Sequence, residues 1–161
     1  MKKLVAIILT VVMVFSMATV AFADTTVNGD SGTVVVKYTT SEAYTVTIPA
    51  DVTLTSTKLS DTGNVTVSDA LLASGETLKI AVESANNYKL VNSTSGIAYT
   101  LKSGDTAITV DNNVVLSVAA GTKSGSAELT FATTEEDVKA ATIAGDHKDT
   151  LTFTVSVAVA K

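Results

Sequence analysis

The side chains that carry out most acid–base chemistry in proteins are scarce in this sequence. It contains one histidine and no cysteine, and that histidine, His147, stands between Asp146 and Lys148. A Ser-His-Asp triad would have to use His147 as its base, and no strained nucleophile-elbow motif accompanies it. A zinc site would lack its usual ligands. We therefore expect no enzymatic activity and interpret His147 as a solvated loop residue.

Carboxylates offer two further chemistries. Paired acids can cleave glycosides, but Glu135, Glu136 and Asp137 are adjacent and precede good helix formers, a pattern typical of a first helical turn. Three oxygen-rich turns could contact calcium, although none forms a complete binding loop. We expect no cofactor, with calcium as the alternative. The three turns are Asn28-Gly29-Asp30, Asp111-Asn112-Asn113 and Asp146-His147-Lys148-Asp149.

Lys37 is a candidate for a self-formed cross-link to an asparagine or aspartate, in an exported domain that has no cysteine. The reaction would need a buried acid and an amide or carboxyl partner facing the lysine. The alternative is a lysine whose ammonium group reaches the rim of a sheet. We keep both interpretations of Lys37.

The last strand carries the most regular polar row of the chain. Thr150, Thr152, Thr154 and Ser156 alternate with the apolar residues of 151–159, so one face is polar and the other meets a core. Such threonine rows occur on surfaces that bind carbohydrate or ice, and on strands that pack against another subunit. They also simply favour β-structure. We predict this row as a possible association strand, because a terminal strand pairs easily with a neighbour.

Residues 1–23 are predicted to be a cleaved signal peptide. Lys2 and Lys3 supply the positive start, an apolar run follows, and Ala21-Phe22-Ala23 provides the small-x-small cleavage site. The protein is thus expected to be secreted or associated with the cell wall. No later stretch is apolar enough to cross a membrane, so no membrane contact is expected after cleavage.

The remaining chain, 24–161, is predicted to be a single domain with a mobile N-terminal segment at 24–32. It is rich in threonine, and the whole sequence has a net charge of −5, which becomes more negative when Lys2 and Lys3 are removed. There is no arginine. This composition argues against nucleic acid as a partner.

Alternating apolar and polar residues recur along the chain, with turn residues between the segments. Nine or ten short strands of this kind predict an all-β, antiparallel Greek-key β-sandwich of immunoglobulin-like type. The first strand is expected at 33–40, a turn at 61–64, and a hairpin that joins 106–110 to 113–118. One short helix or helical turn is expected near 134–142, where capping residues precede helix formers.

Three stretches carry a resemblance: 44–50, 114–131 around Gly121 and Gly125, and 145–155. They resemble small surface proteins of Gram-positive anaerobes, which are immunoglobulin-like sandwiches similar to WxL domains and to fimbrial or spore-coat-U-type subunits. The Trp-x-Leu motif and the cysteines of the coat-like proteins are absent, and His147 stands where an aromatic residue is expected. No catalytic residue is implied by the resemblance.

These observations predict a secreted, non-enzymatic, pilin-like or adhesin-like structural protein of the cell surface or extracellular matrix. Its partners would be other envelope proteins or further copies of itself, or wall or host glycans. The alternative is a carbohydrate-binding module built on a surface cluster from Tyr38, Tyr44, Tyr88 and Tyr99, most of which fit the inward pattern.

Overall fold

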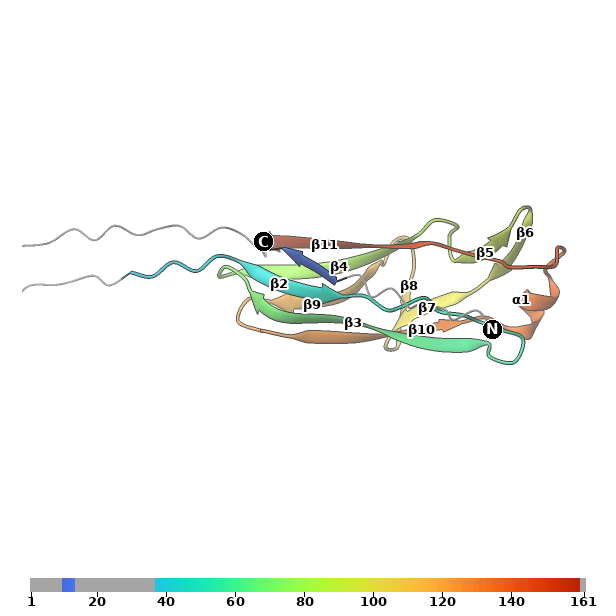
Figure 1. Ribbon diagram of the computed structural model, residues 1–161, viewed down its shortest axis with the longest axis horizontal. Helices are drawn as coiled ribbons and strands as arrows, with labels where there is room; N and C mark the ends of the chain where they lie inside the picture. Colours follow the sequence, from blue (N-terminus) through green and yellow to red (C-terminus); the bar gives the residue numbers. More distant parts are fainter. Residues whose placement is uncertain (1–9, 14–36, 160–161) are drawn as a thin grey trace, which may run out of the picture.

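The computed structural model describes residues 10–13 and 37–159 (Figure 1). Within them the chain forms strands and one short helix, and every strand pair is antiparallel. The predicted all-β fold is confirmed. The elements are β1 (Thr10–Met13), β2 (Ala43–Thr47), β3 (Ser60–Leu71), β4 (Glu76–Ser84), β5 (Lys89–Asn92), β6 (Ser95–Ala98), β7 (Thr100–Ser103), β8 (Thr106–Ile108), β9 (Val114–Ala119), β10 (Gly125–Ala132), α1 (Glu135–Lys139) and β11 (Leu151–Val159).

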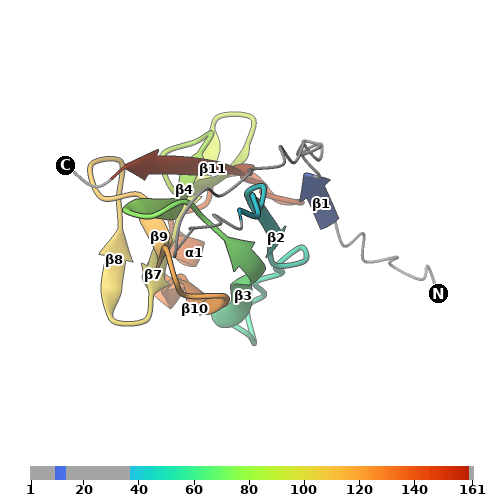
Figure 2. The ribbon, with the colours of Figure 1, turned by 90° about the vertical axis from the view of Figure 1, so that its left-hand side faces the viewer.

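The strands form a sandwich of two main sheets. The larger sheet has the order β1-β2-β3-β10-β7-β8 and the smaller one β11-β4-β9, while β5 and β6 form a separate hairpin. The chain passes directly from one main sheet to the other between β3 and β4, β8 and β9, β9 and β10, and β10 and β11, and it passes from β4 to β7 through the β5–β6 hairpin. Seen end-on in Figure 2, the larger sheet curves around the smaller one.

The core between the sheets is built from the inward positions of the alternating strands. Leu78, Ile80 and Val82 of β4 have no exposed surface at all. They meet equally buried residues of the facing sheet, among them Val65 and Leu129. Burying apolar side chains in this way is the main favourable term in folding, which explains why the alternation predicts the sheets so well.

Helix α1 lies in the crossover from β10 to β11, where the sequence predicted it. Thr134 is its N-cap, and the Asp137 amide donates to the Thr134 hydroxyl over 3.1 Å. The acids of its first turn complement the helix dipole. The helix connects two strands of different sheets, and none of its residues is buried. Its acidic residues are therefore part of this connecting segment.

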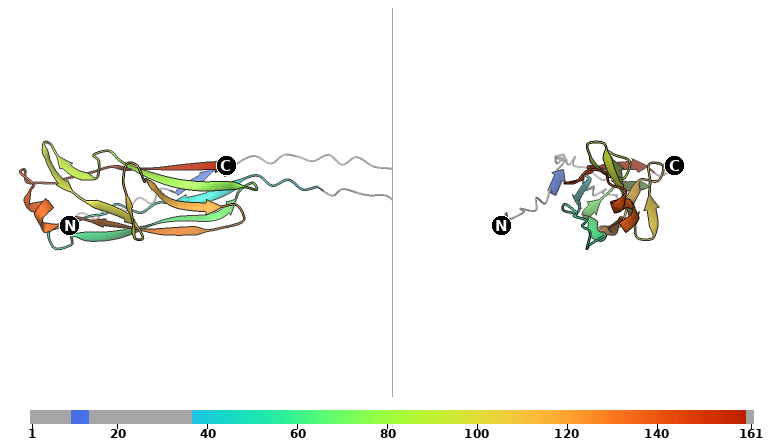
Figure 3. Two further views of the ribbon diagram at one scale, coloured as in Figure 1. Left: turned by 180° about the vertical axis from the view of Figure 1, so that it is seen from behind. Right: turned by 90° about the vertical axis from the view of Figure 1, so that its right-hand side faces the viewer.

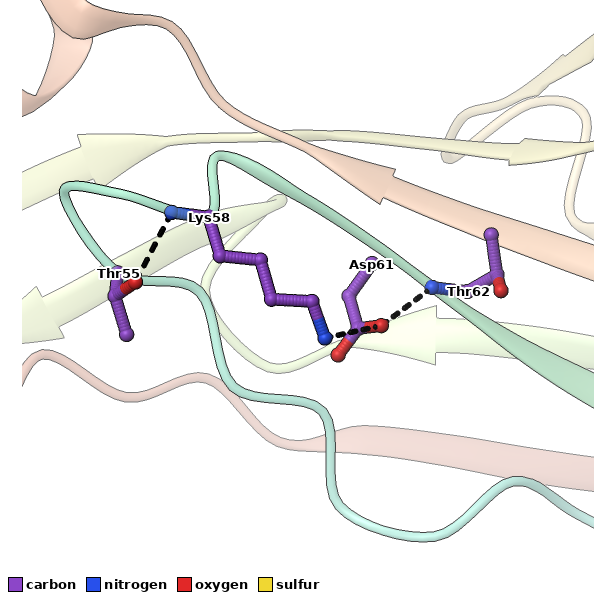
Figure 4. A network of polar contacts seen from close by, with 4 residues as sticks. All are labelled: Thr55, Lys58, Asp61 and Thr62. Carbon is purple, nitrogen blue, oxygen red and sulfur yellow. Dashed lines mark hydrogen bonds and ion pairs between the residues drawn. The ribbon is translucent and has the colours of Figure 1, made fainter.

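The turn predicted at 61–64 is wrong, because these residues lie inside β3. Gly63 has a packing role: a Cβ added there would lie 2.5 Å from the Pro49 Cβ. Asp61 accepts from the Lys58 ammonium at 2.7 Å and from the Thr62 amide at 2.9 Å (Figure 4). These contacts lower the pKa of the Asp61 carboxyl below its usual value, the Lys58 hydrogen bond most of all.

The hairpin predicted from 106–110 and 113–118 is also wrong. Strand β8 pairs with β7 across the turn at Gly104, whereas β9 pairs with β4 in the other sheet. Thr109 and Asn112 exchange backbone hydrogen bonds, so a turn does lie here. It passes the chain from one sheet to the other. Alternation alone cannot say to which sheet a strand belongs.

The first strand was predicted at 33–40, and it is not formed over residues 37–40, the part of this range that the structure describes. Residues 37–40 have no strand assignment, and 37–43 are all exposed. This segment leads away from the sandwich at the end where β11 finishes (Figures 1 and 3). Residues 33–36, the segment 24–32 and the predicted signal peptide, apart from Thr10–Met13, lie outside the described residues.

Candidate association site

Strand β11 is an edge strand of the smaller sheet. It pairs with β4 along its whole length, from Leu151 opposite Ser84 to Val159 opposite Glu76. No described strand pairs with its other side. Its polar row is on the outside of the sandwich, and all four predicted residues are exposed: Thr150, Thr152, Thr154 and Ser156.

The inward side of β11 is only partly covered. Four of its apolar residues contact the core but keep intermediate exposure, in contrast to their fully buried neighbours in β4. Tyr44 of β2 and Ile48, the residue that follows β2, also contact the core and keep intermediate exposure. The half-buried residues of β11 are Leu151, Phe153, Val155 and Val157.

Strand β2 would supply a second edge if β1 were absent. On one side it pairs with β3, and on the other with β1, whose backbone lies antiparallel to it from Thr10 opposite Thr47 to Met13 opposite Tyr44. The whole of β1 falls within the predicted signal peptide. If residues 1–23 are removed, the outer edge of β2 loses this partner.

The two edges lie along the same long side of the sandwich. In Figures 1 to 3, β1 lies at a level between β11 and β2. We call this region the β2–β11 side. It is defined by the outer edges of β2 and β11 and by the half-buried residues named above.

Asp149 anchors the start of β11. One carboxylate oxygen accepts from the Ser84 hydroxyl at 2.6 Å and the Tyr99 hydroxyl at 2.7 Å. The other accepts from the Asn86 backbone and side-chain amides, both at 3.1 Å, and from the Thr150 amide at 2.8 Å. A carboxylate with this many donors holds the strand at the end of β4.

This cluster also explains a strained turn. Asn87 and Tyr88 both have positive φ, at 52° and 58°, which is unusual for a tyrosine. The Tyr88 amide donates to the Ser84 hydroxyl at 2.6 Å, and the Tyr88 ring meets Tyr99 edge to face with centroids 6.0 Å apart. Burial, followed by the hydrogen bond to Asp149, raises the pKa of the Tyr99 hydroxyl. Sequence reasoning missed this cluster, because its members are far apart in the chain.

His147 lies beside a serine, the arrangement an enzyme would require. Its Nε2 is 3.1 Å from the Ser95 hydroxyl, and its Nδ1 is 3.0 Å from the Gly145 carbonyl. Since a carbonyl only accepts, Nδ1 carries the proton and Ser95 donates to Nε2. However, Ser95 is 3% exposed and accepts from the Thr142 amide. The pair ties the 142–148 loop to β6, and we assign it a structural role.

The other candidates are dispersed. Lys37 is exposed and outside any strand, so its cross-link stays a prediction. Tyr38 is 83% exposed and by itself, while Tyr88 and Tyr99 pack against each other. In the described part of the chain no group of three or more metal-binding side chains gathers, and calcium stays untested. Nor does any described helix have the length and apolarity to span a membrane.

A hollow of about 390 Å³ lies where residues 37–42 join β2. It is bordered by the last residues of this segment and by the end of β3 with the two residues after it, and its lining residues are Thr40, Ser41, Glu42, Leu71, Leu72 and Ala73. Hydrogen bonding to Glu76, with the repulsion of its charge, raises the pKa of Glu42. Acidic side chains thus mark the point at which the segment leaves the domain.

Comparison with known proteins identifies no family for this chain. No protein-family model matches the chain, and no curated protein matches it. Among solved structures it is similar to the P pilus rod subunit PapA, with 12% sequence identity, over 62% of this chain and 78% of that chain, at a TM-score of 0.44. The function proposed below rests on the sequence and the geometry of this chain.

Proposed function

We propose that the protein is a secreted, non-enzymatic structural or adhesive subunit of the cell surface or extracellular matrix, which works by associating through the edges of its β-sandwich. Its partners are further copies of itself or other envelope proteins. The predicted signal peptide and the acidic, cysteine-free composition support an exported location.

The observation that carries this proposal is the long, uncovered edge of β11. The nine residues of β11 form the edge of the smaller sheet, with no described strand on their outer side, and their apolar face is half-buried. Soluble proteins usually shorten, charge or cover such an edge, because an open edge pairs with other chains. None of these devices is present along Leu151–Val159, which contains no charged residue and no proline.

The exposed threonine row supports the same role. Thr152, Thr154 and Ser156 lie opposite Glu83, Ala81 and Lys79 of β4, so the outer face of this sheet is polar and regular. A face of this kind can pack against another subunit without making the isolated protein insoluble. The row remains a proposed contact surface.

The test is size-exclusion chromatography with light scattering on chain 24–161, followed by electron microscopy. We expect ordered oligomers or fibres whose population rises with concentration. A protein that stays monomeric at all concentrations, alone and with envelope extracts, contradicts the proposal.

A further inference from the structure

We propose that the outer face of the smaller sheet, β11-β4-β9, packs against the same face of a second copy of this chain, with the strands of the two copies antiparallel. This inference rests on the proposed function and names one contact by which the subunits would associate. The outward residues of the three strands lie in rows across the sheet. The rows are Lys79, Ser117 and Ser156, then Ala81, Val114 and Thr154, then Glu83 and Thr152.

Two opposite charges stand on either side of the centre of this face. In β4, Lys79 precedes Ala81 by two positions and Glu83 follows it by two, and both charged side chains are exposed. Strands β9 and β11 contain no charged residue, and Glu76 at the start of β4 alternates with the inward set. The face therefore carries one positive and one negative charge, about 13 Å apart along the strand.

This charge pattern is complementary to itself when the strands of the two copies run antiparallel. A two-fold axis then passes between the two copies of Ala81, and Lys79 of each copy lies opposite Glu83 of the other. In a parallel arrangement each charge would meet its own copy and be repelled. In the described part of the chain neither Lys79 nor Glu83 takes part in an ion pair, so a second copy would supply the missing partner of each.

The centre of the face carries the apolar surface that the contact would cover. Val114 pairs with Ala81 and is 39% exposed. The two-fold axis places Val114 opposite its own copy, so both side chains lose surface to water. The neighbouring Thr154 and Ser156 are short, which allows two sheets to approach to the usual spacing of about 10 Å. Lysine and glutamate side chains can bridge that spacing at either end.

The position of the β5–β6 hairpin also favours the antiparallel arrangement. The hairpin lies beside the start of β11 (Figure 1), where Val91 and Lys148 exchange backbone hydrogen bonds of 2.8 and 3.0 Å. This is the end of the sheet at which Glu83 lies, because Glu83 pairs with Thr152. The hairpins of two antiparallel copies lie at opposite ends of the contact, whereas those of parallel copies would meet at one end.

The size of the face sets the strength of the expected contact. Three short strands offer a flat area of roughly 30 by 15 Å, which places the contact at the low end of protein interfaces. Association through this face should therefore be weak and rise with protein concentration. It should also weaken as salt is added, because ion pairs at a surface are screened.

Charge reversal tests the pairing, with sedimentation equilibrium of chain 24–161 at low salt as the measurement. Lys79→Glu and Glu83→Lys each replace two attractive contacts of the dimer by two repulsive ones. Each should weaken self-association by roughly 10-fold or more. An equal mixture of the two variants should associate as well as the parent, because both contacts of the mixed dimer join a glutamate to a lysine. The double variant Lys79→Glu/Glu83→Lys should regain the parent's affinity for the same reason.

Lys102→Glu is the matched control. Lys102 is an exposed lysine of β7 in the larger sheet, and its reversal changes the net charge by the same amount as Lys79→Glu. The control should leave association unchanged. Glu83→Lys makes an acidic chain less negative, so a loss of association in that variant cannot come from general charge repulsion. All of these variants should unfold at the parent's temperature, because the altered side chains are exposed.

Carbodiimide cross-linking identifies the contact directly. The reagent activates a carboxylate, the lysine amine attacks it, and an amide forms as the activated oxygen leaves with the urea by-product. An equal mixture of unlabelled and isotopically labelled chain 24–161 distinguishes links between molecules from links within one. We expect mass spectrometry to find Lys79 of one isotope joined to Glu83 of the other.

Four outcomes overturn the inference while the parent chain still associates: unchanged association of Lys79→Glu and Glu83→Lys, a mixture that associates no better than its members, equal weakening by Lys102→Glu, and no link between Lys79 and Glu83 of different isotopes. Each of them leaves the proposed function standing, with its contact elsewhere. A parent chain that never associates contradicts the proposed function itself, so the two failures are distinguishable.

Discussion

Strands β4 and β11 lie side by side with the same alternation, yet they differ in what covers them. In β4 the inward residues have no exposed surface, and both edges are paired, one with β11 and one with β9. In β11 the inward residues keep partial exposure, and one edge has no described partner. The sequence pattern of the two strands is nearly identical.

The difference teaches that alternation reports which side of a strand faces a core, and not whether that core is complete. A strand at the centre of a sheet is covered by its neighbours. A strand at an edge depends on what lies beside it, which a second molecule can supply. The β2–β11 side is the part of this sandwich where such a covering neighbour is missing.

The largest effect is expected where the two strands are tied together. Asp149→Ala removes the acceptor for the Ser84 and Tyr99 hydroxyls and should cost roughly 3 kcal/mol of the free energy of unfolding. Hydrogen exchange should accelerate more in Leu151–Val159 than in Glu76–Ser84. Asp149→Asn keeps one acceptor oxygen and should lose less. Equal acceleration in both strands would mean that Asp149 supports the whole fold and does not anchor β11.

A matched pair of substitutions measures the difference in coverage. Val82→Ala in β4 removes a fully buried side chain and should cost about 2–3 kcal/mol, whereas Val155→Ala in β11 should cost about 1 kcal/mol in the monomer. Urea unfolding at a concentration where the protein is monomeric gives both values. Equal losses would contradict the open character of the β2–β11 side.

Alkaline pH should weaken the contact between Tyr99 and Asp149 that anchors β11, with a smaller effect on stability. The pKa of Tyr99 is raised above 10.0 in the folded protein, so the unfolded chain releases this proton first as the pH rises. The folded state therefore binds more protons there, and its stability falls above about pH 10. Tyr99→Phe should cost about 1 kcal/mol at neutral pH and remove part of this alkaline loss. An unchanged pH profile in the variant would disprove the assignment.

The smallest effect is expected far from this contact. The Lys58 ion pair lowers the pKa of Asp61, so its contribution is present above the unfolded pKa and disappears as the pH falls through the lower, folded value. Lys58→Ala should raise the Asp61 pKa in an NMR titration. It should leave association unchanged, because the pair lies on β3 and the loop before it. Weaker association in this variant would widen the contact surface beyond the β2–β11 side and the smaller sheet.

Much of the fold could be predicted from alternation and turn residues. The inward set of β4, the capped helix after Thr134 and the strand end before Pro49 follow from local chemistry. The two wrong predictions, the turn at 61–64 and the hairpin from 106–110 to 113–118, have a common cause. Each depends on which residue or strand lies opposite in the folded protein. Gly63 resembles a turn residue but makes room for Pro49, and Asp111-Asn112 form a turn that leads into the other sheet.

The candidate site was predictable only in part. The threonine row of β11 is evident from its spacing, but the edge position of the strand depends on the sheet order. The anchor of β11 could not be inferred, because Ser84 and Tyr99 stand 65 and 50 positions from Asp149. The partner of β2 was equally hidden, since the strand that pairs with it lies within the predicted signal peptide.

The measurement that tests the central claim most directly is hydrogen–deuterium exchange on chain 24–161 across a range of concentrations. The account predicts that the amides of Leu151–Val159 that face away from β4 exchange quickly in the dilute protein and become protected as it associates, while those of Glu76–Ser84 stay protected throughout. Exchange in Leu151–Val159 that does not depend on concentration, in a protein that does associate, would contradict it.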